Sequence, residues 1–293
     1  MDRRLSAYNR KFEAHIEFGS DIMKNITNQE FEQLRVYIYK NYGINLTEKK
    51  KTLVMSRLNK VLLEKGFDSY GEYFDYVMND TSGRAVTELI NRITTNHTFF
   101  FREVKHFEFF TAVILPQLER DNQRSKDLRI WSAGCSTGDE PYTLSMLMMD
   151  YFDKDYSKWD LKVLGTDISR QVLDHARSGL YELEATKEMP DPWVKKYFFP
   201  PQSEMIKIRD EIKSNVVFRR FNLMNPFPFK KPFHVIFCRN VMIYFDQKTK
   251  LKLTKKFYDA LEPGGYLLVG HSESIDLENT GFKYIRPAIY RKG

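Results

Sequence analysis

Apolar residues recur at helical spacing over the first third of the chain. The segment that starts at Thr27 opens with a capping-box pattern, Thr27 to Glu30, and its apolar residues then follow every three or four positions up to Gly43. Further runs of the same kind follow, and one of them opens with a second capping-box pattern at Ser69 and Glu72. The pattern predicts an all-helical domain with short connections, with helices at about 27–42, 53–65, 69–77 and 83–93.

Segments without a clear period divide the chain. Residues 1–26 show no firm pattern and are expected to form a partly ordered arm. The phenylalanine-rich segment 94–107 leads into a helix that we expect to end near Pro116, since proline disrupts a helix interior. The polar stretch 120–127 then separates the helical domain and its linker, 27–119, from a second domain, 120–293.

In the second domain, short apolar segments alternate with helical patterns. Such alternation is typical of a parallel sheet with helices on both faces, so the fold class is α/β, doubly wound and Rossmann-like. The last residues, around Pro287, predict two short antiparallel edge strands. Strands are expected at 128–133, 161–166, 215–221, 233–238 and 265–270, and helices at 140–152, 169–178 and 247–261.

One stretch interrupts the alternation, at about residues 181–214. Its sequence "MIKIRDEI", residues 205–212, alternates apolar and polar side chains as a half-buried strand does. We interpret the stretch as a small β-subdomain inserted into the sheet domain, made of a short helix and a hairpin.

Composition adds modest constraints. The chain has 293 residues, a net charge of +7 and a pI near 9.1, which favours an acidic partner or surface. Its two cysteines form no disulfide framework, and no apolar run approaches the roughly 18 residues of a membrane span. The N-terminus lacks the apolar core of a signal peptide. We expect a soluble, cytoplasmic protein that does not insert into membranes.

The candidate site lies where the predicted parallel strands end, because doubly wound sheets bind ligands beyond their carboxyl ends. Four segments reach this edge. They are the glycine turn Gly134–Gly138, the acid Asp167, the pair Asn222 and Leu223, and the pair Arg239 and Asn240. An acid after the second strand is typical of a site for a ribose diol, so the sequence indicates a ribose-bearing ligand.

NAD and S-adenosylmethionine both carry a ribose, and the glycine turn distinguishes between them. It has only two glycines, Gly134 and Gly138, and lacks the three-glycine fingerprint that binds a dinucleotide pyrophosphate. Asp139 and Glu140 also place negative charge there, which would repel a phosphate. S-adenosylmethionine has no phosphate and carries a cationic ammonium and sulfonium, so the acids favour it. Asp139 could equally be an ordinary helix N-cap.

Nucleophilic or base catalysis has weak support in the sequence. Cys135 has no evident histidine partner and is more typical of a small packing residue. His271, in "GHSES", could serve as a base, although a loop histidine is more often structural.

Several motifs, in order, resemble the chemotaxis receptor methyltransferases, the CheR family. The resemblance covers nearly the whole chain from about Thr27, and its specificity comes from the combination of motifs. It implies transfer of a methyl group from S-adenosylmethionine to chemoreceptor glutamates, which gives γ-carboxyl methyl esters and S-adenosylhomocysteine. The motifs are "TTNHTFFFRE", "WSAGCSTGDEPYTL", "TDISRQVLDHARSGLY", "FNL", "FCRNVMIYF" and "LEPGGYLLVGHSES".

The resemblance also implies roles for individual residues. Those assigned to the cofactor site are Asn96, Thr98, Arg102, Gly134, Glu140, Asp167, Asn222, Leu223, Arg239 and Asn240. Within this set, Glu140 would contact the methionine end, Asp167 the ribose, and Asn222 and Leu223 the adenine. Arg102 and Tyr244 would be catalytic, close to the acceptor carboxylate. No metal is expected.

The basic second helix resembles the receptor-facing helix of the family. Lys50, Arg57 and Lys60 are therefore expected to bind the acidic cytoplasmic domains of chemoreceptors, although a solvated charged face is an equal alternative. Some family members grip a tethering peptide with the inserted subdomain. Here the loop "FPPQSEM", residues 199–205, is short, so tether-independent recognition is expected.

Other functional classes remain open at the level of sequence. A nucleic-acid methyltransferase would fit the positive charge, but the segment Asn240–Tyr244 lacks the paired prolines of amino-methylating enzymes. A non-catalytic adaptor that binds S-adenosylmethionine is disfavoured by the presence of Arg102 and Tyr244. We therefore expect a monomeric enzyme with no nucleic-acid partner.

Overall fold

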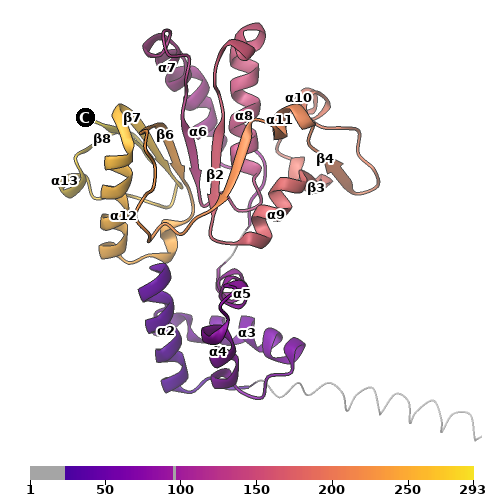
Figure 1. Cartoon of the computed structure of the whole chain (residues 1–293), viewed down its shortest axis with the longest axis vertical. Helices are drawn as coiled ribbons and strands as arrows, with labels where there is room; N and C mark the ends of the chain where they lie inside the picture. The colour runs from indigo at the N-terminus through magenta and orange to yellow at the C-terminus, as the bar shows by residue number, and fades with distance from the viewer. Residues whose placement is uncertain (1–23, 95–96) are drawn as a thin grey trace, which may run out of the picture.

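The computed structural model describes residues 24–94 and 97–293. It shows a group of helices at one end of the molecule and a larger α/β unit above it, as the predicted fold class requires (Figure 1). The expected arm, 1–26, falls outside the described residues except for its last three, and Asn96 falls outside them as well.

The helical domain forms as its apolar pattern predicts. Thr27 and Glu30 complete the capping box of the first helix, and Gly43 ends that helix in the left-handed conformation. The pattern at Ser69 is only half a box, because the Glu72 carboxylate accepts from Asp68 N–H instead of Ser69. The helices are α2 (Asn28–Tyr42), α3 (Lys51–Lys65), α4 (Tyr70–Asn79) and α5 (Arg84–Ile93), with a short turn at Glu48–Lys50.

The expected helix end at Pro116 is wrong. One helical run continues through α6 (Val104–Phe109), a π-helical turn (Phe110–Ile114) and α7 (Leu115–Asp121). In the π turn the Leu115 N–H donates to the Phe110 carbonyl, five residues back. This shift of register restarts the helix just before Pro116, which then lies in a first turn where no N–H is needed.

The sheet has seven strands in the order β5-β2-β1-β6-β7-β9-β8. The five strands β5, β2, β1, β6 and β7 run parallel to one another. The two C-terminal strands extend the sheet beyond β7 by antiparallel pairing, β9 with β7 and β8 with β9, as predicted. The strands are β1 (Ile130–Ala133), β2 (Val163–Asp167), β5 (Val216–Arg220), β6 (Phe233–Cys238), β7 (Leu261–Val269), β8 (Phe282–Arg286) and β9 (Ile289–Lys292).

Alternate residues of the central strands bury into different cores. On β6, Val235 and Phe237 pack in the cluster that includes residues of α6 to α9, whereas Ile236 and Cys238 pack in the cluster of α12. A parallel strand buried on both faces reads as a continuous apolar run, which explains the sequence of β6. The sheet helices are α8 (Asp139–Phe152), α9 (Arg170–Ser178), α12 (Gln247–Ala260) and the short α13 (Leu277–Thr280).

The interrupting stretch projects from the side of the sheet domain, next to α9 (Figure 1). It contains β3 (Leu180–Glu182), a 3₁₀ turn (Leu183–Thr186), α10 (Asp191–Tyr197), β4 (Met205–Lys207) and α11 (Asp210–Lys213). The expected helix and hairpin are present, the hairpin closing at Gln202 and Met205, and β3 adds a strand. The expectation of strand through "MIKIRDEI" is wrong after Ile208, since Asp210–Lys213 turns into a helix.

The helical domain packs against the edge where the parallel strands end. The Asn45 N–H donates to the Tyr244 carbonyl at 2.8 Å, and Asn222 Nδ2 donates to the Asn41 carbonyl at 2.9 Å. A further contact joins α5 to the residue before α9, where Asn91 Nδ2 donates to Ser169 Oγ at 2.9 Å.

Among the described helices, none is long and apolar enough to cross a membrane.

Candidate active site

A cavity of about 470 Å³ lies between the helical domain and the strand ends. Its size is ordinary for a small-molecule site. We call one side the strand wall, formed by Gly134–Ser136, Asp167, Asn222 and Leu223, and the other side the linker wall, formed by Thr98, Phe99, Arg102 and Arg239. Tyr244 also lines the cavity, so every predicted cofactor or catalytic residue within the described part borders it.

The glycine turn gives the strand wall its shape. Gly134 has φ +81°, and a Cβ on this residue would collide with the Val241 side chain. The Gly134 and Cys135 N–H groups both donate to the Thr166 carbonyl, at 2.8 and 2.9 Å, which ties the turn to β2. The backbone therefore passes close to the cavity where only glycine fits.

Asp167 is oriented entirely by backbone groups. Its Oδ2 accepts from Ser136 N–H and its Oδ1 from Ser169 N–H, both at 2.9 Å. Burial raises the pKa of Asp167, and these hydrogen bonds act in the opposite direction. Each carboxylate oxygen can accept a second hydrogen bond, so the side chain can still receive both hydroxyls of a ribose diol.

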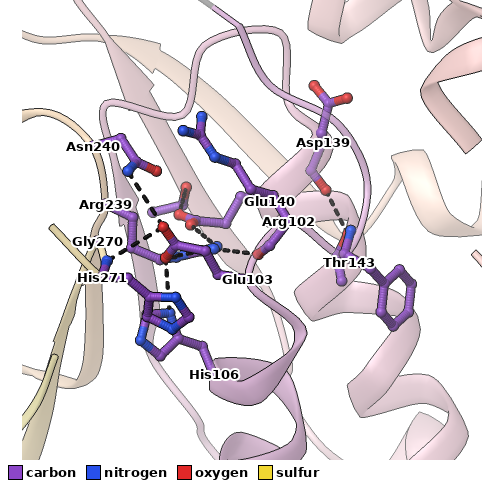
Figure 2. A network of polar contacts seen from close by, with 12 residues as sticks. Arg102, Glu103, His106, Asp139, Glu140, Thr143, Arg239, Asn240, Gly270 and His271 are labelled. Carbon is purple, nitrogen blue, oxygen red and sulfur yellow. Dashed lines mark hydrogen bonds and ion pairs between the residues drawn. The ribbon is translucent and has the colours of Figure 1, made fainter. Parts of the chain in front are cut away.

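Glu140 belongs to an ion-pair cluster shared by distant segments (Figure 2). Arg239 Nη1 lies 2.8 Å from Glu140 Oε2, and Arg239 Nη2 lies 3.2 Å from Glu103 Oε2. Ser132 Oγ donates to the other Glu140 oxygen at 2.7 Å, and Arg239 Nη2 also donates to the Arg102 carbonyl. Two partly buried carboxylates share one buried guanidinium, so this cluster keeps a formal charge of −1.

Glu103 is an acid that the sequence analysis did not single out. It stands at φ +58° before α6, and its Oε1 lies near the His271 N–H and the Asn240 amide, at 3.3 and 3.4 Å. Burial would raise the pKa of Glu103, but the Arg239 guanidinium and the His271 N–H outweigh burial and lower it. The sequence could have indicated Glu103 as a site residue, because it follows Arg102 in the linker motif.

Asp139 is not the helix N-cap. Gly138, at φ +92°, holds that position, and Asp139 is the first residue of α8. The Thr137 hydroxyl donates to its carboxylate at 2.6 Å, and burial raises the pKa of Asp139. The carboxylate points away from the Glu103–Arg239–Glu140 cluster, because the turn at Gly138 directs it toward Thr137 (Figure 2). Of the two acids after the glycine turn, Glu140 is the one that borders the cavity.

Two further polar residues, Glu273 and Lys256, support the loops at the strand ends and were not predicted from the sequence. The buried Glu273 accepts from the N–H groups of Gly270, Asn240 and Ile243, at 2.6, 2.8 and 3.0 Å. Burial raises the pKa of Glu273, and these bonds oppose the shift. It holds Asn240 at φ +59° beside the cavity, and its place in "GHSES" after an apolar strand could have indicated it.

Lys256 supports the segment that follows β5. Its Nζ donates to the Leu223 carbonyl at 2.5 Å and to the Asn225 carbonyl at 2.6 Å. Burial lowers the pKa of Lys256 to about 8. The Asn222 side chain meanwhile bonds Asn41 and the Met224 N–H, so its amide is already used in joining the domains.

The linker brings Arg102 to the cavity. Phe100 is fully buried, and Phe101 adopts φ +61°, so the chain reverses between them and Arg102. Arg102 Nη1 donates to the His97 carbonyl at 2.5 Å, which leaves further donors of its guanidinium for a ligand. The apolar neighbours anchor the linker and allow the charged head to face the cavity.

The basic residues predicted to bind the receptor lie elsewhere. Lys50 precedes α3, while Arg57 and Lys60 are on α3 itself. Arg57 is half-buried and donates to the Ile93 carbonyl at 2.8 Å, whereas Lys60 is exposed and lies 3.9 Å from Glu64. The receptor-binding role of this helix stays a prediction.

Family models match both parts of the chain. The model described as "CheR methyltransferase, SAM binding domain" matches residues 96–290, and the one described as "CheR methyltransferase, all-alpha domain" matches residues 29–94. The chain belongs to the CheR methyltransferase family. It is thus a methyltransferase of chemotaxis that uses S-adenosylmethionine, and the family resemblance noted in its motifs is confirmed.

Relatives of the same family align over most of their length. A chemotaxis protein methyltransferase of Borreliella burgdorferi is 45% identical over 271 residues, which cover 92% of this chain and 95% of that protein. A probable chemotaxis protein methyltransferase of Rhizobium etli is 37% identical, with 82% and 91% covered. The chemotaxis protein methyltransferase of Escherichia coli is 34% identical, with 85% of each chain covered.

The cavity suits the cofactor of this CheR domain. Asp167 has acceptor capacity for a ribose diol, and the Glu140 cluster retains the negative charge that an ammonium group needs. Gly134 keeps the backbone close enough for contact, and Leu223 offers an apolar surface beside the position expected for the adenine. S-adenosylmethionine has no phosphate, so its site does not need the free N–H groups that bind one.

Proposed function

We propose that this chain transfers the methyl group of S-adenosylmethionine to glutamate side chains in the cytoplasmic domains of chemoreceptors. The observation that carries the proposal is that Arg102 opens onto the same cavity as Asp167 and Glu140. Asp167 and Glu140 suit a cationic nucleoside and Arg102 suits a carboxylate, so the cavity can hold two ligands of opposite charge. The names of the relatives support chemotaxis as the setting.

The chemistry needs little beyond positioning. When bound, S-adenosylmethionine supplies a methyl group attached to a positively charged sulfur. The γ-carboxylate of a glutamate is ionised at neutral pH, since its ordinary pKa is about 4.3, so the chain needs no general base. Arg102 can hold the carboxylate through its planar fork, and Tyr244, which lines the same cavity, can help to orient it. Catalysis then comes from alignment of the reacting groups.

The direct test is incubation of the purified chain with methyl-labelled S-adenosylmethionine and receptor cytoplasmic fragments. We expect label on glutamate that base releases as methanol, because methyl esters hydrolyse readily in alkali. Base-stable label, or label on added nucleic acid, would contradict the proposal. Receptor fragments with the candidate glutamates changed to alanine serve as the matched control.

We also infer that recognition does not need a tethering peptide. The loop of the inserted hairpin is closed tightly by reciprocal hydrogen bonds between Gln202 and Met205, at 2.8 and 3.1 Å. A titration with a receptor C-terminal pentapeptide should show no binding at micromolar concentration. Saturable micromolar binding would refute this inference while leaving methyl transfer itself in place.

A further inference from the structure

Three potential metal ligands from two distant segments converge behind the linker wall. Glu103 and His106 come from the start of α6, and His271 follows β7 (Figure 2). One ligand atom of each residue lies within 4.8 Å of the corresponding atoms of the other two. The rings of His106 and His271 meet edge to face with their centroids 4.7 Å apart.

His106 is the most unusual member of this cluster. Its side chain is 1% exposed, yet neither ring nitrogen makes a hydrogen bond within the described part of the chain. A buried polar group without a partner destabilises the folded state, so such groups are rare in folded proteins. A neutral imidazole has a lone pair on one of its two nitrogens, so the unpartnered ring can offer a ligand atom beside a carboxylate and a second imidazole.

The spacing already suits a tetrahedral ion. Two ligands at about 2.0–2.1 Å from Zn²⁺ lie about 3.3 Å apart at the tetrahedral angle. His106 Nδ1 and Glu103 Oε2 are separated by 3.4 Å. His271 is exposed, so its ring can turn toward these atoms, and the open side leaves room for water as the fourth ligand.

We propose that Glu103, His106 and His271 form a site for a divalent transition-metal ion of the zinc class, and that the ion competes with Arg239 for Glu103. Two imidazoles and one carboxylate suit Zn²⁺, Co²⁺ or Ni²⁺, whereas Mg²⁺ prefers oxygen ligands alone. The second nitrogen of His106 has no orienting acceptor, so the affinity is lower than that of a structural zinc site.

Competition for Glu103 connects the site to the linker wall. Glu103 Oε2 is also the atom that faces Arg239, at 3.2 Å. An ion on this oxygen replaces the Arg239 contact and leaves Arg239 with Glu140 and the Arg102 carbonyl. The prediction for activity rests on the proposed function: metal should slow methyl transfer. Metal binding itself does not depend on that function.

The site is tested with the full-length chain freed of metal by chelator. Titration with Zn²⁺ by calorimetry, and with Co²⁺ by its visible absorption, should show one equivalent bound, the Co²⁺ spectrum being that of a tetrahedral site. His271→Gln, an exposed change, should weaken binding at least about tenfold, since even outer-shell changes cost that much. His175→Gln changes another exposed histidine, on α9, and should bind as the wild type does.

Each outcome decides one part of the proposal. No binding by the wild type, or equal affinities in His271→Gln and His175→Gln, overturns the site. A Zn²⁺-dependent loss of methyl transfer, reversed by chelator and reduced in His271→Gln relative to its own metal-free rate, supports the competition. Metal binding that leaves the methyl-transfer rate unchanged overturns the competition. If the preparation transfers no methyl group at all, the binding titrations still test the site.

Discussion

The strand wall and the linker wall of the cavity are held in place by different means. On the strand wall, Asp167 is fixed by two backbone N–H groups from its own loop and the neighbouring one. On the linker wall, Arg239 is held by carboxylates from two other segments, Glu140 on α8 and Glu103 before α6. The first arrangement follows directly from the sheet, whereas the second requires the linker to dock correctly.

From this difference we infer that the two walls serve different steps of the reaction. A wall built from backbone contacts is rigid, so it suits binding of a cofactor that every reaction cycle uses. A wall built from ion pairs between separate segments depends on how those segments dock, so it suits the positioning of the acceptor carboxylate. We therefore expect strand-wall changes to act mainly on cofactor affinity and linker-wall changes mainly on turnover.

The largest effect is expected from Arg102→Ala. Loss of a donor that orients the reacting carboxylate should lower kcat for methyl transfer by about 100- to 1000-fold. The affinity for S-adenosylhomocysteine, measured by calorimetry, should change much less. Arg124→Ala, at an exposed arginine after α7, is the control. Equal losses in kcat and in affinity would abolish the distinction between the walls.

Asp167→Ala should show the reverse pattern. Two charge-assisted hydrogen bonds to a ribose contribute about 1.5 kcal/mol each, so affinity for S-adenosylhomocysteine should fall about 100-fold. Asp174→Ala removes an exposed acid of the neighbouring helix α9 and should have no such effect. Near-normal affinity in Asp167→Ala would show that this carboxylate does not face the sugar.

Glu103→Gln tests how the linker wall is held. Removing the charge leaves Glu140 as the carboxylate that still pairs with Arg239. The kcat/KM for methyl transfer should therefore fall about tenfold, the value of one hydrogen bond to a charged group. Glu108→Gln, five residues further along the chain and exposed, provides the matched control. An unchanged kcat/KM would mean that the Glu103–Arg239 pair plays no part in positioning the linker wall.

The smallest effect concerns pH and Lys256. Its ammonium binds the Leu223 and Asn225 carbonyls, and burial lowers its pKa from 10.5 to about 8. The charged form is therefore present below pH 8 and is lost as the pH rises through that value. Affinity for S-adenosylhomocysteine should weaken a few-fold between about pH 7 and pH 9, roughly the value of one neutral hydrogen bond.

The comparison of two variants isolates this effect. Lys256→Met keeps the apolar stem and should lack the part of the pH dependence that the ammonium causes, whereas the exposed Lys255→Met should retain it. Because the amine of the ligand also titrates, the difference between the variants is the quantity to measure. Identical pH profiles would exclude Lys256 as a support of the strand wall.

Much of the fold follows from local patterns. The helical domain is predictable because each helix repeats apolar residues on one face and begins or ends at a capping residue such as Thr27 or Gly43. The parallel sheet is predictable because strands buried on both faces read as apolar runs. Pro116 misled the prediction, since the π turn that accommodates it depends on hydrogen bonds that no local pattern specifies.

The sequence by itself determined which segments meet at the site, because the carboxyl ends of parallel strands share one edge. Only the tertiary structure decided how the charges there are paired. Glu140 shares Arg239 with Glu103, Asp139 turns back to Thr137, and Glu273 and Lys256 support the loops from behind. Apart from Thr137 and Asp139, these partners lie far apart in the chain, and their burial and contacts arise only when the domains and the linker pack together.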